Sequence, residues 1–358
     1  MSQAELLNNI TILSHLHGGC EYVKGGGGNT SVKDENTLWV KPSGTTLLGL
    51  QPDTFVEMDR KRLSEIYSIT PPEVASEREK LVLTVMENAK CEDVPARASV
   101  EAPLHNIFDA RYVVHTHPPM VNGMTCGING KEACAKLFPD ALWVDYIDPG
   151  YTLCIEVMRE IDTYVKKNNV QPKLLFMKNH GVFVAADTVE EMTSLYKDMM
   201  EALRKKYNEN NVDLVMTSKP AKANIAKKLQ QILESYKEIN GSTPCVATGN
   251  FLELPKQPLT PDHIVYMKAK LFTAEPNVKN LQSFKHDNGY LPLLLISDDG
   301  FIAVGETQMS AQLTMTLAMD EAYVLQLSEA FGGVELMTDA AQSFIINWES
   351  EAYRKKQS

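Results

Sequence analysis

Tyr112-Val113-Val114-His115-Thr116-His117-Pro118 is the stretch on which both the fold and the candidate site depend. Its tyrosine and two valines favour a buried strand, and Pro118 ends that strand. Residues two apart on a strand point to the same face, so His115 and His117 project together. Neutral imidazole is the commonest protein ligand for Zn²⁺, and a catalytic zinc needs three protein ligands with one position left open. The stretch therefore indicates part of a metal site, which needs a third ligand from elsewhere in the chain, while surface or structural histidines are the alternative for a lone His-x-His pattern.

The composition is that of an ordinary globular protein, with 358 residues, of which 44% are hydrophobic and 23% charged. A formal net charge of -11 argues against nucleic acid as a partner. No segment approaches the roughly 20 apolar residues of a membrane span, and the N-terminus lacks the basic start and apolar run of a signal peptide. We therefore expect a cytoplasmic protein that binds neither nucleic acid nor membranes.

The cysteines form no Cys-x-x-Cys pair, which argues against a zinc ribbon or a redox motif. Buried reduced thiols are the expectation for all six. They are Cys20, Cys91, Cys126, Cys134, Cys154 and Cys245.

Two turns rich in small residues precede the histidine strand. In the first, residues 25–31, four consecutive glycines allow the backbone to approach a ligand closely, and Asn29 adds a polar group. A predicted strand over 37–41 leads to the second turn, which contains Ser43 and Gly44. Facing one another, the turns would form a phosphate pocket that needs no lysine, although a flexible surface loop explains the glycines equally well. The glycine spacing matches neither the dinucleotide fingerprint nor a P-loop, which disfavours nucleotide binding.

Glu101 and His180 are the candidates to join the two histidines. Ser99 occupies an expected N-cap position, so Glu101 lies near a helix start, where a glutamate usually only complements the helix dipole. This glutamate precedes the histidine strand by one short helix, however, and could reach a metal. His180 lies in an Asn-His-Gly connection between predicted strands at 174–178 and 182–185. It is the predicted third ligand, with a structural turn histidine as the alternative.

The second half of the chain repeats the first in weaker form. A polar boundary at about 209–222 predicts two domains, residues 1–215 and residues 216–358. Residues 261–268 resemble 110–117, and residues 293–307 resemble 174–188, each segment being followed by a long helix. In this alignment the three histidines become Tyr266, Lys268 and Asp299. The second copy therefore has the pattern of strands without the ligands, and we expect it to be structural or to form an interface.

Taken in order, these motifs resemble the class II aldolase/adducin family. The resemblance covers about residues 5–205 and rests on Gly-Gly-Gly-Asn-Thr-Ser, Pro-Ser-Gly, Ser-x-Glu-x-x-x-His, His-x-His and Asn-His-Gly. Asp145-Tyr146-x-x-Pro149-Gly150 and the faded second copy look most like the aldolase portion of bifunctional rhamnulose-phosphate aldolase/dehydrogenases. The resemblance implies an α/β fold, a three-layer α/β/α sandwich around a mostly antiparallel sheet. It also implies a homo-oligomer, typically a tetramer with active sites between subunits.

The same resemblance implies roles for individual residues. His115, His117 and His180 would bind Zn²⁺ or another divalent metal, and Glu101 would be the acid/base. The implied phosphate site consists of Gly28, Asn29, Ser43, Gly44 and Ser99. A second hydroxyl residue often stands in the family where this chain has Val100, a departure that fits an altered or unphosphorylated substrate.

The implied activity is that of a metal-dependent aldehyde-lyase acting on a small sugar phosphate. It would cleave a ketose 1-phosphate of the rhamnulose or fuculose type to dihydroxyacetone phosphate and lactaldehyde. Breaking a bond beside a ketone leaves an enediolate, which a metal stabilises as a Lewis acid while Glu101 moves a proton. Tyr146 and Tyr151 are candidate donors to the departing aldehyde. The alternatives are a pentulose-phosphate 4-epimerase or a sugar-phosphate dehydratase on the same site, and an adducin-like protein-binding module without catalysis.

Overall fold

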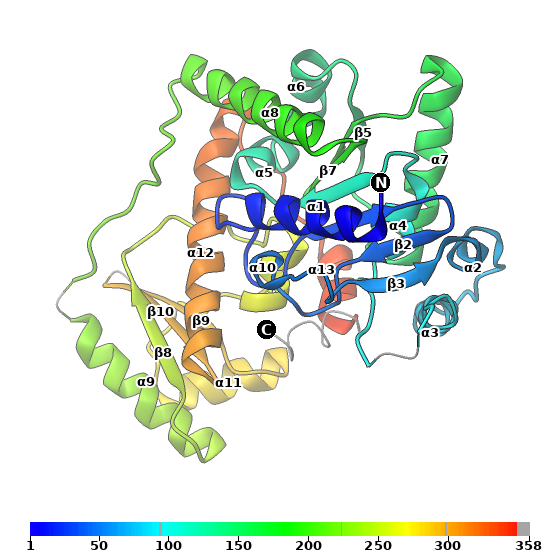
Figure 1. Cartoon of the computed structure of the whole chain (residues 1–358). Helices are drawn as coiled ribbons and strands as arrows, with labels where there is room; N and C mark the ends of the chain where they lie inside the picture. Colours follow the sequence, from blue (N-terminus) through cyan, green and yellow to red (C-terminus); the bar gives the residue numbers. More distant parts are fainter. Residues whose placement is uncertain (93–94, 223, 298, 349–358) are drawn as a thin grey trace.

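Within the residues that the computed structural model describes, 1–92, 95–222, 224–297 and 299–348, seven strands form one large sheet (Figure 1). Their order across the sheet is β3 (Val56–Asp59), β2 (Thr37–Val40), β1 (Asn29–Lys33), β4 (Tyr112–Thr116), β7 (Gly181–Ala186), β6 (Leu174–Met177) and β5 (Leu142–Val144). Neighbouring strands are antiparallel except for the parallel pair β5 and β6. The histidine stretch thus forms the buried strand β4, between β1 and β7, and the mostly antiparallel sheet is confirmed.

Helices cover both faces of this sheet, so the fold is the expected three-layer α/β/α sandwich. One face packs against α1 (Gln3–Leu16), α5 (Pro119–Thr125), α6 (Gly130–Leu137) and α8 (Val189–Glu209). The other packs against α2 (Arg60–Leu63), α3 (Ala75–Asn88), α4 (Ala102–Ile107) and α7 (Tyr151–Asn168), with the short 3₁₀ helices η1 (Leu47–Gly49) and η2 (Ser64–Ser68) in the connections. Side chains alternate along β4, so each face of the strand contributes to a hydrophobic core. Tyr112 and Val114 pack on the side of α1 and α8, and Val113 packs on the side of α4 and α7.

A second, smaller sheet lies in residues 224–348, which we call the second unit. It has the order β8 (Cys245–Gly249), β10 (Gly300–Gly305) and β9 (Leu294–Ser297). Two helices, α9 (Ile225–Asn240) and α11 (Val278–Asn288), cover one face, and the long helix α12 (Gln308–Ser328) covers the other. The chain continues through η3 (Glu329–Phe331) to α13 (Asp339–Asn347). Helix α12 runs from the second sheet to α5 in the first sandwich, and so joins the two parts (Figure 1).

The predicted repeat is only half correct. β9 and β10 form an antiparallel pair followed by α12, as β6 and β7 are followed by α8. Residues 261–268, aligned above with the histidine strand, instead form helix α10 (Pro261–Met267). The hydroxyl of Thr260 accepts a hydrogen bond from the backbone N–H of His263, and Pro261 occupies the first turn. These are helix-start signals, and they prevail over the β-branched residues that follow.

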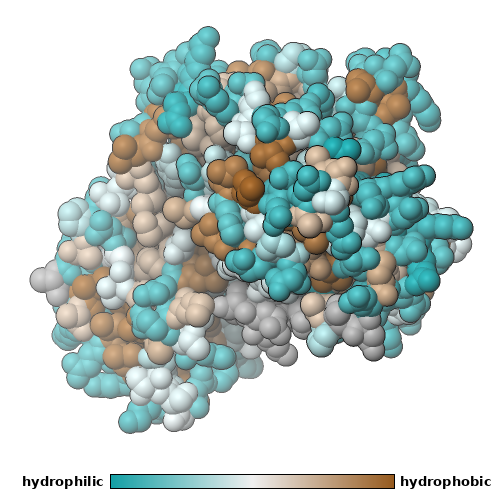
Figure 2. Space-filling model, in the orientation of Figure 1, coloured by the Kyte–Doolittle hydropathy of each residue, from teal (hydrophilic) through white to brown (hydrophobic). Residues whose placement is uncertain are grey.

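The surface of the described residues carries a few apolar side chains. Figure 2 shows apolar patches in the middle of the view, over the region of α1, and at other places on this face. The exposed large apolar side chains of α1 and η1 are Ile12, Leu16 and Leu48. No helix in the described part of the chain is long and apolar enough to cross a membrane. Among the cysteines, Cys20 and Cys91 are exposed, so the expectation of buried thiols is wrong for these two, which lie in connections outside the sheet.

Candidate metal-dependent active site

The three predicted ligands meet at one end of the central strands. His115 is the penultimate residue of β4, His117 follows that strand, and His180 ends the tight turn between β6 and β7. One ligand nitrogen from each residue can be chosen so that all three lie within 4.8 Å of one another. Phe183 of β7, which pairs with His115 across the sheet, stacks on that imidazole with ring centroids 4.1 Å apart. The sheet register therefore brings together residues that are 65 positions apart in the chain, from 115 to 180.

Hydrogen bonds orient two of the imidazoles toward the same point. The Nδ1 atom of His115 lies 2.9 Å from the carbonyl oxygen of Val182, and that of His117 lies 2.5 Å from a carboxylate oxygen of Asp262. The Val182 carbonyl and an ionised Asp262 only accept hydrogen bonds, so each ring carries a proton on Nδ1 and directs Nε2 at the other ring. These two Nε2 atoms are 2.9 Å apart, the length of a hydrogen bond through one shared proton. With both Nε2 atoms unprotonated, the same pair is a donor set that fits a divalent metal.

His180 is held in the neutral state that a metal requires. Burial lowers the pKa of its imidazole to about 3, and the nearby rings of His117 and His115 act in the same direction. Gly181, the next residue, has no room for a side chain, because a Cβ there would lie 2.4 Å from the carbonyl oxygen of Thr116 and 2.7 Å from the His117 ring. The glycine therefore allows the turn to bring His180 beside the histidine strand.

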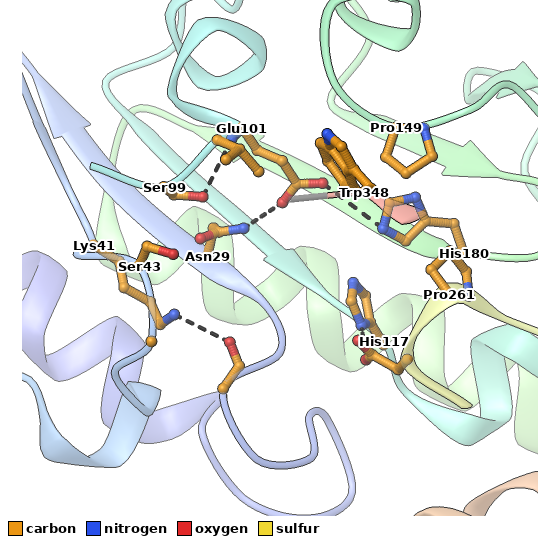
Figure 3. A pocket seen from close by; sticks show the side chains of 14 residues that line it. Asn29, Lys41, Ser43, Ser99, Glu101, His117, Pro149, His180, Pro261 and Trp348 are labelled. Carbon is orange, nitrogen blue, oxygen red and sulfur yellow. Dashed lines mark hydrogen bonds and ion pairs between the residues drawn. The ribbon is translucent and has the colours of Figure 1, made fainter. Parts of the chain in front are cut away.

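Glu101 faces the three histidines from the start of α4. One carboxylate oxygen, Oε1, lies 3.6 Å from Nε2 of His115 and 3.7 Å from Nε2 of His180. The other, Oε2, accepts a hydrogen bond from the side-chain amide of Asn29 (Figure 3). The helix begins at Ala102 with Glu101 as its N-cap, two residues later than Ser99 predicts. The Ser99 hydroxyl nevertheless accepts a hydrogen bond from the backbone N–H of Glu101 at 3.2 Å.

Most of the other predicted site residues line the same pocket. Its atom-free space is about 550 Å³, open solvent at its mouth included. Asn29, Ser43, Gly44 and Ser99 line it together with Glu101, His117 and His180, whereas His115 lies just behind the wall and is fully buried. Figure 3 shows Lys41 and Ser43 on one side of the pocket and His117 and His180 on the other. The two small-residue turns and the histidines thus form one cavity.

Gly28 has a different position from the one predicted. Of the four glycines at 25–28, Gly26 is the one that lines the pocket. Gly28 has a φ of +71°, and a Cβ there would lie 2.6 Å from the side chain of Val23 and 2.8 Å from the carbonyl oxygen of His115. The residue is therefore required for the close packing of the loop against β4, and it does not contact the cavity.

Several lining residues escaped prediction. Lys41 is almost fully buried, and its ammonium lies 3.2 Å from the carbonyl oxygen of Gly26. Its position in the sequence, directly after a predicted strand and before the turn with Ser43 and Gly44, could have indicated that it lies near the pocket. Pro261, Asp262 and Trp348 come from the second unit, and no spacing in the sequence relates them to the histidines.

The candidate proton donors lie elsewhere. The described residues that line the pocket include Pro149 but neither Tyr146 nor Tyr151. Tyr151 donates to the carbonyl oxygen of Ile69 in the core beneath α3 and α7, and Tyr146 donates to Asp148. Burial raises the pKa of both phenols. Neither tyrosine lines the described pocket, so the part they would play as proton donors stays a prediction from the sequence.

Comparison with known proteins assigns the family. Residues 10–207 match the family described as the Class II Aldolase and Adducin N-terminal domain. This match covers more than half of the chain, so the chain belongs to the class II aldolase/adducin family. It extends from the middle of α1 into the last turn of α8 and includes each of the three histidines and Glu101.

Individual relatives are distant. The uncharacterized oxidoreductase YuxG of Bacillus subtilis is 24% identical over 201 residues, which are 52% of this chain, and the chain spans only 28% of that protein. The N-terminal class II aldolase domain of a conserved protein from Thermoplasma acidophilum is 22% identical, with a TM-score of 0.48, covering 56% of this chain and 92% of its own. L-fuculose-1-phosphate aldolase from Thermus thermophilus is 16% identical, with a TM-score of 0.39, and the match covers 58% of this chain and 97% of that enzyme's chain.

Proposed function

We propose that this chain is a class II, metal-dependent aldolase that cleaves a ketose 1-phosphate of the rhamnulose or fuculose type to dihydroxyacetone phosphate and lactaldehyde. The observation that carries the proposal is the convergence of three imidazoles, one carboxylate and two polar turns on a single pocket. Membership of the class II aldolase/adducin family supports it. Within that family, we favour kinship with the aldolase portion of rhamnulose-phosphate aldolase/dehydrogenases. Residues 1–215 would be the catalytic domain.

Zn²⁺ is the ion we propose, with His115, His117 and His180 as its ligands. Imidazole nitrogen suits zinc better than the oxygen-seeking Mg²⁺ or Ca²⁺, and three protein ligands leave a position open for substrate. A divalent cation held by neutral ligands supplies undiminished positive charge to substrate oxygens on which negative charge develops.

Glu101 is the proposed proton carrier. Asn29 engages one of its carboxylate oxygens, which leaves Oε1 directed toward the histidines. With the substrate held on the metal, an oxygen so placed would lie beside the carbon from which the aldehyde departs, where it would deliver the proton that this carbon gains in cleavage and remove it in synthesis. Burial excludes most competing water, since Glu101 is only 8% exposed.

The phosphate is proposed to bind on the opposite side of the pocket. Lys41 contributes an ammonium to this wall, Ser43 and Ser99 contribute hydroxyls, and Gly44 and Asn29 complete it. Charge-assisted hydrogen bonds of this kind are the strong ones in anion recognition. Val100 also lines the pocket, so one contact that a second hydroxyl would make is replaced by an apolar one.

We also propose a homo-oligomer, of which a tetramer is the form to seek first. The exposed apolar side chains Ile12, Leu16 and Leu48 provide surface for such a contact. Sedimentation velocity of the purified protein measures the assembly directly, and a monomer at micromolar concentration would contradict this part of the proposal.

A coupled assay tests the reaction. Purified protein supplied with Zn²⁺ should release dihydroxyacetone phosphate from rhamnulose 1-phosphate or fuculose 1-phosphate, with lactaldehyde as the second product. Conversion of a pentulose phosphate to its 4-epimer, or loss of water from a sugar phosphate, would assign the pocket to the alternative reactions. Metal binding without turnover of any of these substrates would contradict the aldolase, and a chain that binds no metal would favour the adducin-like binding module.

A further inference from the structure

The second unit enters the candidate active site through α10. Pro261 and Asp262, the first two residues of this helix, line the pocket, and Figure 3 shows Pro261 on the side of His117 and His180. Asp262 is 5% exposed, and its Oδ2 atom lies 2.5 Å from Nδ1 of His117. The two residues are 145 positions apart in the chain. A carboxylate from one sheet unit thus contacts a candidate metal ligand of the other.

Buried ionic contacts fix α10 in this position. His263, the residue after Asp262, is fully buried, with its Nε2 atom 3.1 Å from Asp320 and its Nδ1 atom 3.4 Å from Glu321, both on α12. Asp320 also pairs with Lys24, which precedes the glycine turn, at 2.7 Å. Buried charges persist only where they are paired, so these partners hold the helix and the turn in a definite place.

The same helix contacts the opposite wall of the pocket. The hydroxyl of Tyr266 accepts a hydrogen bond from the backbone N–H of Gly26 at 3.3 Å. Gly26 lines the pocket, and its carbonyl oxygen accepts a hydrogen bond from the Lys41 ammonium. Through Asp262 and Tyr266, α10 therefore reaches both the histidine side and the glycine turn.

We infer that Asp262 is a positioning residue of the metal site, and that the second unit completes this site in addition to any structural or interface role. The inference rests on the metal site proposed above. A carboxylate that accepts the Nδ1 proton of a ligating histidine fixes its tautomer and ring orientation, and it makes Nε2 a stronger donor. Without Asp262, His117 would be free to carry its proton on Nε2 or to rotate, and in either case His117 no longer ligates for part of the time.

Metal affinity of purified protein tests this without measuring turnover. Metal is removed with a chelator, and Co²⁺ is then titrated against a competing chelator in wild type, Asp262→Ala and Asp262→Asn, with the visible Co²⁺ absorption recorded. Loss of such a partner costs about 10- to 100-fold in metal affinity, which is the loss we expect for the alanine variant. The asparagine variant keeps an accepting oxygen, so it should recover part of the affinity and a spectrum closer to that of wild type.

Two further variants separate this effect from a general disturbance. Tyr266→Phe removes the hydrogen bond between the same helix and the backbone of Gly26, and Asp299→Asn removes one negative charge from the second unit where it pairs with Lys228. Both should bind Co²⁺ as wild type does. Equal affinity in wild type and both Asp262 variants would overturn the inference while the metal site stands, and an equal loss in Tyr266→Phe would also overturn it. Absence of Co²⁺ binding by wild type would overturn the metal site itself, and the inference with it.

Discussion

At the scale of single residues, the two oxygens of Glu101 have different surroundings. Asn29 engages Oε2, while Oε1 faces two imidazoles at 3.6 and 3.7 Å. Replacement by Gln keeps the size of the side chain and removes its ability to carry a proton. We expect Glu101→Gln to retain wild-type metal content and to lose at least about 100-fold in kcat, the lower end for general acid–base catalysis. Full activity of this variant in the coupled assay would contradict the role of Glu101.

Lys41 supports a second prediction at this scale. Its side chain is about 1% exposed and ends at the pocket wall proposed for the phosphate. Lys41→Met keeps the length and the apolar contacts but removes the charge, so the KM for a ketose 1-phosphate should rise about 10- to 100-fold, as expected for a charge-assisted hydrogen bond. Metal content provides the control and should not change. An unaltered KM would assign phosphate binding to the turns alone.

The sequence predicts the candidate ligands well because they depend on local rules. His115 and His117 share a strand face through their spacing, and His180 lies in a turn that its neighbouring glycine marks. Lys41 and Asp262 were missed for a physical reason. A lysine at the end of a strand is ordinarily solvated, and a carboxylate at the start of a helix ordinarily caps it, so only the packing of distant segments directs both into the pocket.

At the scale of secondary structure elements, the C-terminus of α1 contains a titratable contact. His17, the C-cap residue, is 4% exposed, its Nδ1 atom lies 2.9 Å from the carbonyl oxygen of Leu13, and its ring stacks on Tyr196. Burial lowers the pKa of His17 to about 4. The folded state thus resists protonation that the unfolded chain accepts near its ordinary pKa of about 6.5. This contribution to stability is complete above pH 6.5 or so, and it is lost as the pH falls from there toward 4.

The expected size of this effect at about pH 5 is about 2 kcal/mol of unfolding free energy. Urea unfolding of metal-free protein at about pH 7.5 and about pH 5 measures it, with His17→Gln as the comparison because glutamine does not titrate. Wild type should lose about 2 kcal/mol more than the variant on acidification, since other titrating groups affect both proteins alike. Equal losses would show that His17 is not buried as a neutral ring.

The error at α10 also belongs to this scale. Ile264 and Val265 align with Val113 and Val114 of the histidine strand, but Thr260 and Pro261 before them form a helix start. β9, β10 and α12 were predicted correctly, because a strand pair and a long apolar helix leave strong patterns. The alignment of the two halves gave more weight to the overall similarity than to this N-cap and first-turn proline, which favour a helix.

At the scale of the whole molecule, α12 joins the two sheets. Its residues Met315, Leu317 and Ala318 pack in the core of the second unit, whereas Leu327 is fully buried in the core of the first sandwich. We therefore expect the described parts to unfold together, in a single calorimetric transition. Leu327→Ala should lower the unfolding free energy by about 3 kcal/mol through lost burial and the cavity left behind, and the single transition should persist. Two separate transitions in wild type would contradict this coupling.

The central claim, that three histidines bind a catalytic metal, is tested most directly by elemental analysis of purified wild type and His117→Ala, after dialysis against excess Zn²⁺ and then metal-free buffer. The three-imidazole site predicts about one ion per chain in wild type and a large loss in the variant. Glu101→Gln, purified in parallel, should contain as much metal per chain as wild type. Equal metal content in wild type and His117→Ala, or none in either, would contradict the account.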